Sequence, residues 1–279
     1  MVDEIKAEFA AVLKQWDVVD REEIYHYTTI EAALEIMKGR VLWSSDVLSM
    51  NDGSEFRHAV SIVDEVLMSR WNVLPIQVAE YFRPRKLLLI GRTWNMLAVC
   101  ICSEPDLLSQ WRAYASGCRG VAIGFRVGPL HGFGGASKEF GLVRIHYSSA
   151  KLRDAAQRMR DLALRLAGSS VLSYDEAEIF WSEVALALLN FSIRFKHPGF
   201  ADEREWRAPT LDTGDLQVLC RGSGERTRRY VHIHFPADVV SQIVVGPLAS
   251  AGTESELRTF LDDHDLRHVA VSRSTIPLR

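Results

Sequence analysis

The stretch IYHYTTIEAALEIMKGRVLWSS, residues 24–45, decides the expected fold. Its first five residues are aromatic or β-branched around one histidine, a composition typical of a β-strand. Thr29 is placed to cap a helix over 31–38, which the following glycine ends, and strand character returns over 41–44. The stretch therefore predicts a strand, a helix and a second strand, followed by a turn-rich segment over 45–52.

Residues on either side of this unit predict further helices and strands. Helical spacing of apolar residues covers 3–16, 55–71, 75–90, 107–115, 150–166, 174–195 and 255–262. Strand-like composition covers 97–102, 121–125, 142–147, 205–208, 216–220, 229–235, 242–245 and 268–272. Because strands lie toward both ends with long helices between them, we expect one α+β domain over residues 1–279. A helical insertion or subdomain is expected at about 148–200.

The composition excludes several classes of protein. Of the 279 residues, 47% are hydrophobic, which excludes a disordered chain and leaves enough volume for a core. Thirty-three basic residues against 36 acidic ones give a net charge of −3, so any contact with nucleic acid must come from a local patch. No apolar run approaches the roughly 20 residues of a membrane-spanning helix, and the first residues lack the pattern of a secretion signal. We expect a soluble cytoplasmic protein with no membrane partner.

The cysteines and histidines do not predict a metal site. Cys100, Cys102, Cys118 and Cys220 have the spacing of neither a zinc ribbon nor a redox pair, and we expect buried thiols in a reducing compartment. Cys100 and Cys102 lie two apart and would share one face of a strand. His232 and His234 share a strand face in the same way, but no third ligand completes a site, so no metal is expected.

Two polar clusters on the first two strands are candidate ligand contacts. Strand alternation places His26 and Thr28 on one face, where they are able to hydrogen-bond a ribose or another substrate. The alternative is a histidine satisfied within the core. Trp43-Ser44-Ser45 ends the next strand and Asn51 follows it, a set able to contact the flat ring and hydroxyls of a ligand. The alternative here is a serine-rich turn that leads into an Asx turn.

A late charged segment is the third candidate. Alternation places Glu203, Glu205 and Arg207 on one side of a strand. A carboxylate at this place is able to stabilise developing positive charge, as glycosyl transfer requires. The alternative is a salt-bridged edge strand, with the carboxylates paired by Arg207 or by a neighbour such as Lys196.

Two further sets of residues have both a functional and a structural interpretation. Trp111 and Tyr114 lie three apart on one face of a predicted helix, where they would stack a base or a nicotinamide, or form part of the core. A basic stretch would contact phosphates or form a solvated hairpin; it consists of Arg221, Arg226, Arg228 and Arg229.

Taken in order, several motifs resemble those of the bacterial domain of unknown function 2971 family. They are Tyr25-His26-Tyr27-Thr28, Leu42-Trp43-Ser44-Ser45, Asn51-Asp52 with Glu55, Cys100-x-Cys102-Ser103-Glu104, Leu108-x-x-Trp111-x-x-Tyr114, Gly120-Val121-x-Ile123-Gly124-Phe125 and Glu203-x-Glu205-Trp206-Arg207. The resemblance spans about residues 24–246. The chain departs from the family pattern at Met50 and Gly53, where Phe-Asn-Asp-Pro is more usual, and at Gln110, where Met is usual.

That family in turn resembles, more distantly, the ADP-ribosyltransferase superfamily, in particular its diphtheria-toxin-like and DNA-modifying branches. The resemblance implies a split mixed or antiparallel β core and NAD as co-substrate. It implies that His26 holds the NAD ribose and that Glu205 is the catalytic acidic residue, with Glu203 as the alternative. The nicotinamide would be flanked by the strand that carries Trp43 and Ser44, or by Trp111 and Tyr114.

The function implied by this resemblance is that of an NAD-dependent ADP-ribosyltransferase-like enzyme. It would cleave the nicotinamide glycosidic bond and modify a nucleic-acid or protein acceptor, as a toxin or an anti-phage effector. A catalytic Glu205 predicts that Glu205→Gln folds but is inactive. One alternative is an NAD glycohydrolase, or an RNA 2′-phosphotransferase that uses Arg207 and Arg112. Another is a non-catalytic nucleotide-binding or interaction module.

Overall fold

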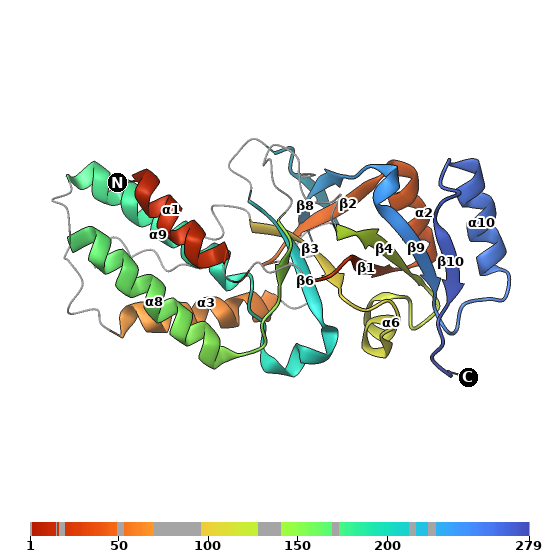
Figure 1. Cartoon of the computed structure of the whole chain (residues 1–279), viewed down its shortest axis with the longest axis horizontal. Coiled ribbons are helices and arrows are strands. Elements are labelled where there is room, and N and C mark those ends of the chain that lie inside the picture. Colours follow the sequence, from red (N-terminus) through yellow and green to blue (C-terminus); the bar gives the residue numbers. More distant parts are fainter. Residues whose placement is uncertain are drawn as a thin grey trace.

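The computed structural model describes residues 2–14, 16, 20–48, 53–69, 96–127, 141–168, 173–211, 216–222 and 227–278. The helix expected over 75–90 lies outside these residues. Figure 1 shows helices α1, α3, α8 and α9 gathered at the end of the molecule that holds the N-terminus, with the sheet at the end that holds the C-terminus. The expected α+β class is therefore confirmed.

The elements have the following bounds. The α-helices are α1 Val2–Lys14, α2 Ile30–Gly39, α3 Gly53–Met68, α6 Leu108–Tyr114, α8 Ser149–Gly168, α9 Tyr174–Ser192 and α10 Thr253–Asp263. The strands are β1 Glu23–Thr28, β2 Val41–Asp46, β3 Met96–Cys102, β4 Val121–Arg126, β5 Val143–Arg144, β6 Glu205–Leu211, β7 Leu219–Arg221, β8 Arg228–His234, β9 Val240–Val245 and β10 Ala270–Arg273. Two 3₁₀ helices are η2 Pro198–Glu203 and η4 Ala237–Val239. None of the described helices is long and apolar enough to cross a membrane.

The opening strand, helix and strand form as expected, with two differences. Thr29 caps α2 by accepting a hydrogen bond from the amide of Ala32 at 3.2 Å. The left-handed residue that ends the helix is Arg40, with φ 52°, one position after the predicted glycine. Strand β2 runs through Asp46 into the predicted turn segment, because its last two residues pair with β3. Local turn propensity is overridden there by strand pairing.

The sheet is mixed and mostly antiparallel. Its strands follow the order β10-β9-β4-β1-β3-β2-β8-β7, and β6 pairs with both β3 and the short β5. Only β9 and β10 are parallel among the described pairs. The segment expected as a strand over 142–147 is reduced to β5 and an isolated bridge at His146. Strand β6 thus lies inside the sheet, so the edge position considered for it from sequence is wrong.

Strand β3 is the place where the sheet opens. One edge of β3 pairs with β6 over its whole length, from Met96 to Cys102. On its other edge, β2 pairs only with Leu97 and Ala98, and β1 pairs only with Cys102. Between these two contacts no described strand pairs with this edge of β3. The sheet therefore separates between β1 and β2, and this opening holds the site described below.

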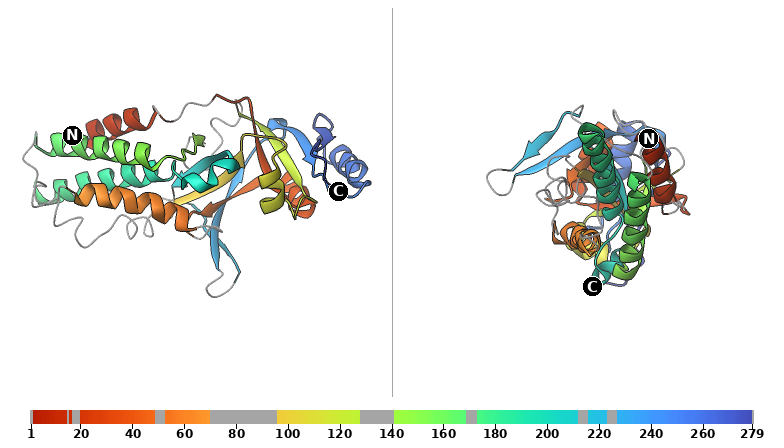
Figure 2. Two further views of the ribbon diagram at one scale, coloured as in Figure 1. Left: turned by 90° about the horizontal axis from the view of Figure 1, so that it is seen from below. Right: turned by 90° about the vertical axis from the view of Figure 1, so that its left-hand side faces the viewer.

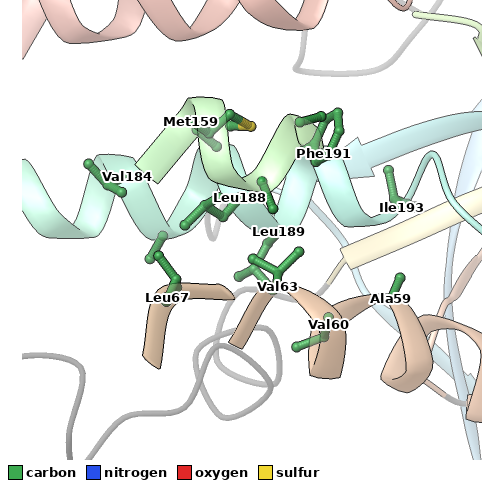
Figure 3. Close-up of a cluster of buried hydrophobic side chains, with 14 of the residues drawn as sticks. Ala59, Val60, Val63, Leu67, Met159, Val184, Leu188, Leu189, Phe191 and Ile193 are labelled. Atoms are coloured by element: carbon green, nitrogen blue, oxygen red, sulfur yellow. The ribbon is translucent and has the colours of Figure 1, made fainter. Parts of the chain in front are cut away.

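Three clusters of buried side chains hold the layers together. One cluster packs β-strand residues against α2 and α10, and a second packs β1 and β4 against α6. The third cluster joins α3, α8 and α9, and Figure 3 shows Val63, Met159, Leu188 and Phe191 converging there. Helices α1 and α3 pack with α8 and α9, so the helical unit extends beyond the insertion expected at about 148–200.

The hairpin of β7 and β8 continues the sheet beyond β2. Residues of β8 pair with β2 over five positions, from Val41↔His234 to Ser45↔Tyr230, and β7 pairs with the outer edge of β8. Figure 2 shows this hairpin projecting from the body of the molecule. One face of the extension is therefore open beside the point where the sheet separates.

We expect Gly120→Ala to destabilise the protein. A Cβ at Gly120 would lie 2.1 Å from the carbonyl oxygen of Thr28, where β4 begins beside the end of β1. Crowding of this kind typically costs about 1–3 kcal/mol. Urea unfolding followed by circular dichroism measures the loss, and Gly141→Ala is the matched control because nothing lies within 4 Å of a Cβ there. Equal stability of the two variants would contradict the close approach of β1 and β4.

Candidate functional site

A pocket of about 240 Å³ lies where β1 and β2 separate along β3. Its lining comes from those three strands, from β6 and α6, from the segment that follows α9, and from the β7–β8 hairpin. His26, Trp43, Tyr114, Glu203 and Glu205 therefore come together although they span most of the chain. The first-strand histidine and the late carboxylates thus line one pocket.

His26 reaches the unpaired edge of β3. Its Nδ1 lies 3.2 Å from the carbonyl oxygen of Cys100, and because a carbonyl only accepts, Nδ1 carries the proton and donates. Burial lowers the pKa of His26 below its ordinary value, which favours the neutral ring. In that tautomer Nε2 is a hydrogen-bond acceptor, so the ring is able to receive a bond from a ligand hydroxyl.

A buried ion-pair network surrounds Glu205. Arg207 donates from Nε to Glu205 Oε1 at 2.7 Å and from Nη2 to Oε2 at 3.2 Å, while Lys196 Nζ donates to Oε2 at 3.1 Å. Lys196 also pairs with Glu203 Oε2, and Arg207 donates to the backbone oxygen of Ile193 at 3.1 Å. The pairing by Lys196 and Arg207 that was the alternative interpretation is thus present, inside the sheet.

The charge state of Glu205 follows from these contacts. Burial by itself would raise the pKa of Glu205, but the guanidinium of Arg207 and the ammonium of Lys196 outweigh burial and lower the pKa to about 2. Both carboxylate oxygens accept charged hydrogen bonds, and its side chain is only 7% exposed. Glu205 is therefore a fixed anion that holds two buried cations in place.

Glu203 occupies a different environment although it shares Lys196. It ends the 3₁₀ helix η2, and the left-handed residue Arg204, with φ 48°, separates it from β6. Its side chain is 17% exposed, and its Oε1 accepts a hydrogen bond from the hydroxyl of Tyr114 at 3.3 Å. Gln110 holds the same turn by donating from Nε2 to the backbone oxygen of Glu203 at 3.2 Å. Of the two carboxylates, Glu203 is the one more accessible to a ligand.

Two aromatic rings border the pocket. Trp43 extends from β2 and is 44% exposed, while Tyr114 comes from the end of α6. Ser45 lies on the same face of β2 as Trp43 and also lines the pocket. These rings offer flat apolar surface beside the Glu203 carboxylate, the combination that a planar ring attached to a sugar requires.

Several residues predicted to bind the cofactor lie elsewhere. Ser44 is buried on the opposite face of β2, where its hydroxyl bonds Thr210 at 3.2 Å. Trp111 is fully buried, with its indole Nε1 donating to Asp106 at 2.7 Å and its ring packed on Tyr27. Neither lines the pocket because each points into a core.

Other predicted positions also lie away from the pocket. Thr28 is not among the residues that line it, and Asn51 lies outside the described residues. Arg112, named for a phosphotransferase, is exposed on α6 and does not line the pocket. The second arginine named for that reaction, Arg207, does line the pocket, but its guanidinium is bound to Glu205.

The cysteines are all free thiols; Cys102 and Cys118 are buried as expected, whereas Cys100 is half-buried and Cys220 is exposed. Cys100 and Cys102 share the pocket face of β3 as expected, and burial raises the pKa of Cys102 to about 12, so it is a poor nucleophile. Cys220 on β7 is exposed rather than buried, because β7 lies on the projecting hairpin. In the described part of the chain, no group of three or more His, Cys, Asp or Glu residues is placed to hold a metal ion.

The structure brings further residues to the site. Lys196 joins both carboxylates, and the hydroxyl of Tyr147 accepts a hydrogen bond from the amide of Glu205 at 2.8 Å. Arg221 and Arg228, from the basic stretch that the sequence predicted as a phosphate contact or a solvated hairpin, line the pocket from the hairpin. The sequence named Lys196 only as a neighbour able to pair the carboxylates.

Comparison with known proteins agrees with the predicted family. A family model described as a protein of unknown function (DUF2971) matches residues 110–208, which supports the predicted family resemblance over that segment. The match contains Tyr114, Lys196, Glu203 and Glu205, whereas His26 precedes it. No curated protein and no solved structure matches the chain. The resemblance to ADP-ribosyltransferases therefore stays a prediction.

We expect Glu205→Gln to be destabilised, instead of folding normally as a purely catalytic residue would allow. Glutamine leaves Lys196 and Arg207 without their shared anion, and breaking a buried pair in this way typically costs about 3–5 kcal/mol at neutral pH. Urea unfolding at pH 7 measures the effect. Glu203→Gln is the matched control, because it is more exposed and leaves both cations paired with Glu205.

The pH dependence of this difference provides a second readout. Because the folded pKa of Glu205 is about 2 and its ordinary value is 4.5, its contribution is complete above about pH 5. It is lost as the pH falls from there through 2. The stability gap between wild type and Glu205→Gln should therefore shrink on acidification, and a gap that stays constant from pH 7 to pH 2.5 would contradict the network.

Proposed function

We propose that this chain is an NAD-dependent ADP-ribosyltransferase-like enzyme that cleaves the nicotinamide glycosidic bond. The observation that carries the proposal is that one pocket gathers His26 from the first strand and the two carboxylates that precede or begin β6. The motif resemblance assigns these same residues to the ribose and to catalysis. The opening of the sheet beside β3 provides the space in which they meet.

The chemistry of the pocket residues fits NAD as a substrate. Tyr114 offers flat surface for the nicotinamide ring, and Glu203 and His26 offer acceptors for ribose hydroxyls. The volume of about 240 Å³ is small against the roughly 300–1,000 Å³ of ordinary ligand pockets. We therefore place the nicotinamide riboside in the pocket and the remainder of NAD along its mouth.

Glu203 is the residue that we assign to catalysis. Loss of nicotinamide leaves positive charge on the sugar, and a carboxylate that binds the adjacent hydroxyl stabilises that charge in the transition state. Glu203 is accessible enough to accept such a bond, and its contacts with Lys196 and Tyr114 fix its orientation. No covalent bond to the carboxylate is required.

Glu205 supports this role indirectly. It holds Lys196, which in turn contacts Glu203, so Glu205 is a positioning residue in this proposal. His26 keeps its ring fixed against the Cys100 carbonyl and offers Nε2 to a ribose hydroxyl. The aromatic rings at the pocket exclude water, which favours transfer to an acceptor over hydrolysis.

Nicotinamide release from NAD is the direct test. Wild-type protein should release nicotinamide, and Glu203→Gln should do so at least on the order of 100-fold more slowly, as for loss of one stabilising group elsewhere. Glu35→Gln on the exposed surface of α2 removes the same charge far from the pocket and should match wild type. Addition of single-stranded DNA, RNA or a protein extract distinguishes transfer from glycohydrolysis.

Two outcomes would count against the proposal. A normal rate from folded Glu203→Gln would remove the assigned carboxylate from the mechanism. Tight NAD binding without any product from folded wild type would instead support a non-catalytic nucleotide-binding module.

A further inference from the structure

The face of β2, β8 and β7 that continues outward from the pocket carries rings and guanidinium groups together. Trp43 pairs with His232, and Tyr230 lies two residues earlier on β8, so their side chains project on one side. Arg221 pairs with Arg228, and alternation along β8 places this pair on the same side as Tyr230. We call these five residues the aromatic–arginine face.

The rings of this face form a ladder that solvent reaches. Trp43 and Tyr230 are stacked with centroids 4.5 Å apart, and the ring of His232 lies nearly parallel to Trp43 at 6.4 Å. Trp43 is nevertheless 44% exposed, and His232 is exposed. The guanidinium of Arg221 lies 5.0 Å from the centroid of Trp43, so one face of the indole accommodates a planar cationic group. A base is able to replace that group.

The charges on the two faces of the hairpin are arranged differently. On the opposite face, Arg229 donates to the carboxylate of Asp46, and Val231 and Ile233 enter the core. On the aromatic–arginine face, no carboxylate among the described residues pairs with Arg221 or Arg228. This face is therefore a local positive patch on a protein whose net charge is −3.

From this arrangement we infer that the aromatic–arginine face binds single-stranded nucleic acid. Bases stack on Trp43, Tyr230 and His232, and Arg221 and Arg228 hold the backbone phosphates, the combination used by proteins that bind single strands. A duplex does not satisfy the face, because the flat surfaces of its bases are covered by neighbouring base pairs. In naming the acceptor class of the enzyme, this inference rests on the proposed function; as a binding site it stands alone.

Continuity with the pocket supports the acceptor role. Trp43, Arg221 and Arg228 belong both to this face and to the pocket lining. A strand that lies along the face therefore brings one nucleotide to the pocket mouth, beside Glu203. The pocket and the aromatic–arginine face thus share residues and form one continuous path for a strand.

Fluorescence anisotropy with labelled oligonucleotides tests the inference without any NAD. The probes are oligo-dT and oligo-U of about 12 nucleotides, within the usual site size, and a DNA duplex of the same length. We expect wild type to bind the single strands more tightly than the duplex. The DNA and RNA arms identify which strand is preferred.

Variants of the face provide the specific readout. Loss of one stacked base is worth about 5- to 150-fold in affinity, so Tyr230→Ala should weaken binding by this factor while Tyr230→Phe retains it. Arg221→Ala with Arg228→Ala should lower the slope of log K against log salt by about 1.4, since each phosphate contact to a single strand contributes about 0.7. Arg267→Ala, an exposed arginine that pairs with Asp262, should change neither quantity.

The possible results separate this inference from the proposed function. Absence of strand binding by folded wild type at low salt, equal binding by Tyr230→Ala, or equally tight binding of the duplex overturns the inference. Strand binding without nicotinamide release overturns the proposed function and leaves the binding face in place. Nicotinamide release without strand binding overturns the inference about the binding face and leaves the proposed function in place.

Discussion

The arrangement of this protein depends on the buried ion pairs that the Glu205 carboxylate forms with Arg207 and Lys196. The carboxylate faces Arg207 on its own strand and Lys196 from the segment after α9, and all three side chains are almost fully buried. Arg207 also reaches the backbone at Ile193, where the long helix ends. An unpaired charge at this depth is costly, so the three groups require one another. The network therefore fixes where the helical layer joins the sheet.

This junction lies directly beside the opening of the sheet. Arg207 and Glu205 pair with Cys100 and Cys102 on one edge of β3, while the other edge of β3 is open between β1 and β2. His26 fills part of that opening by donating to a carbonyl that no strand partner reaches. The same residues that stabilise the fold thus form the wall of the pocket. The stability of the fold depends on Glu205 and its two cations, and the pocket wall includes Glu203, which contacts one of those cations.

Glu205 and Glu203 differ in their contacts because their surroundings differ. Glu205 is saturated by cations, whereas Glu203 lies on a turn held by Gln110 and contacts Tyr114 at the pocket. Two residues that differ by two positions in sequence therefore have different chemistry. The projecting hairpin adds exposed rings and arginines at the pocket mouth, which places recognition of a long ligand next to the proposed catalytic carboxylate.

The sequence alone determined the elements of this fold and much of which residues share a face. Apolar spacing gave α8 and α9, β-branched and aromatic runs gave β1, β3 and β4, and the α+β class followed from their order. Alternation correctly grouped Glu205 with Arg207, and Cys100 with Cys102, but it wrongly placed Glu203 on the same strand, because Glu203 ends η2. These features could be predicted because they depend on neighbours within a few residues along the chain.

Only the tertiary structure decided which face of each element is covered and by what. Ser44 meets Thr210, Lys196 meets Glu203 and Glu205, and Trp111 packs on Tyr27, and the alternation of a strand or helix does not specify such partners. Trp111 and Tyr114 share a short helix, yet one is fully buried and the other borders the pocket. Periodicity sets the relative orientation of side chains within an element, whereas burial and charge pairing depend on contacts between distant segments. The residues of the site could therefore be named from sequence, but their roles depend on how the sheet opens.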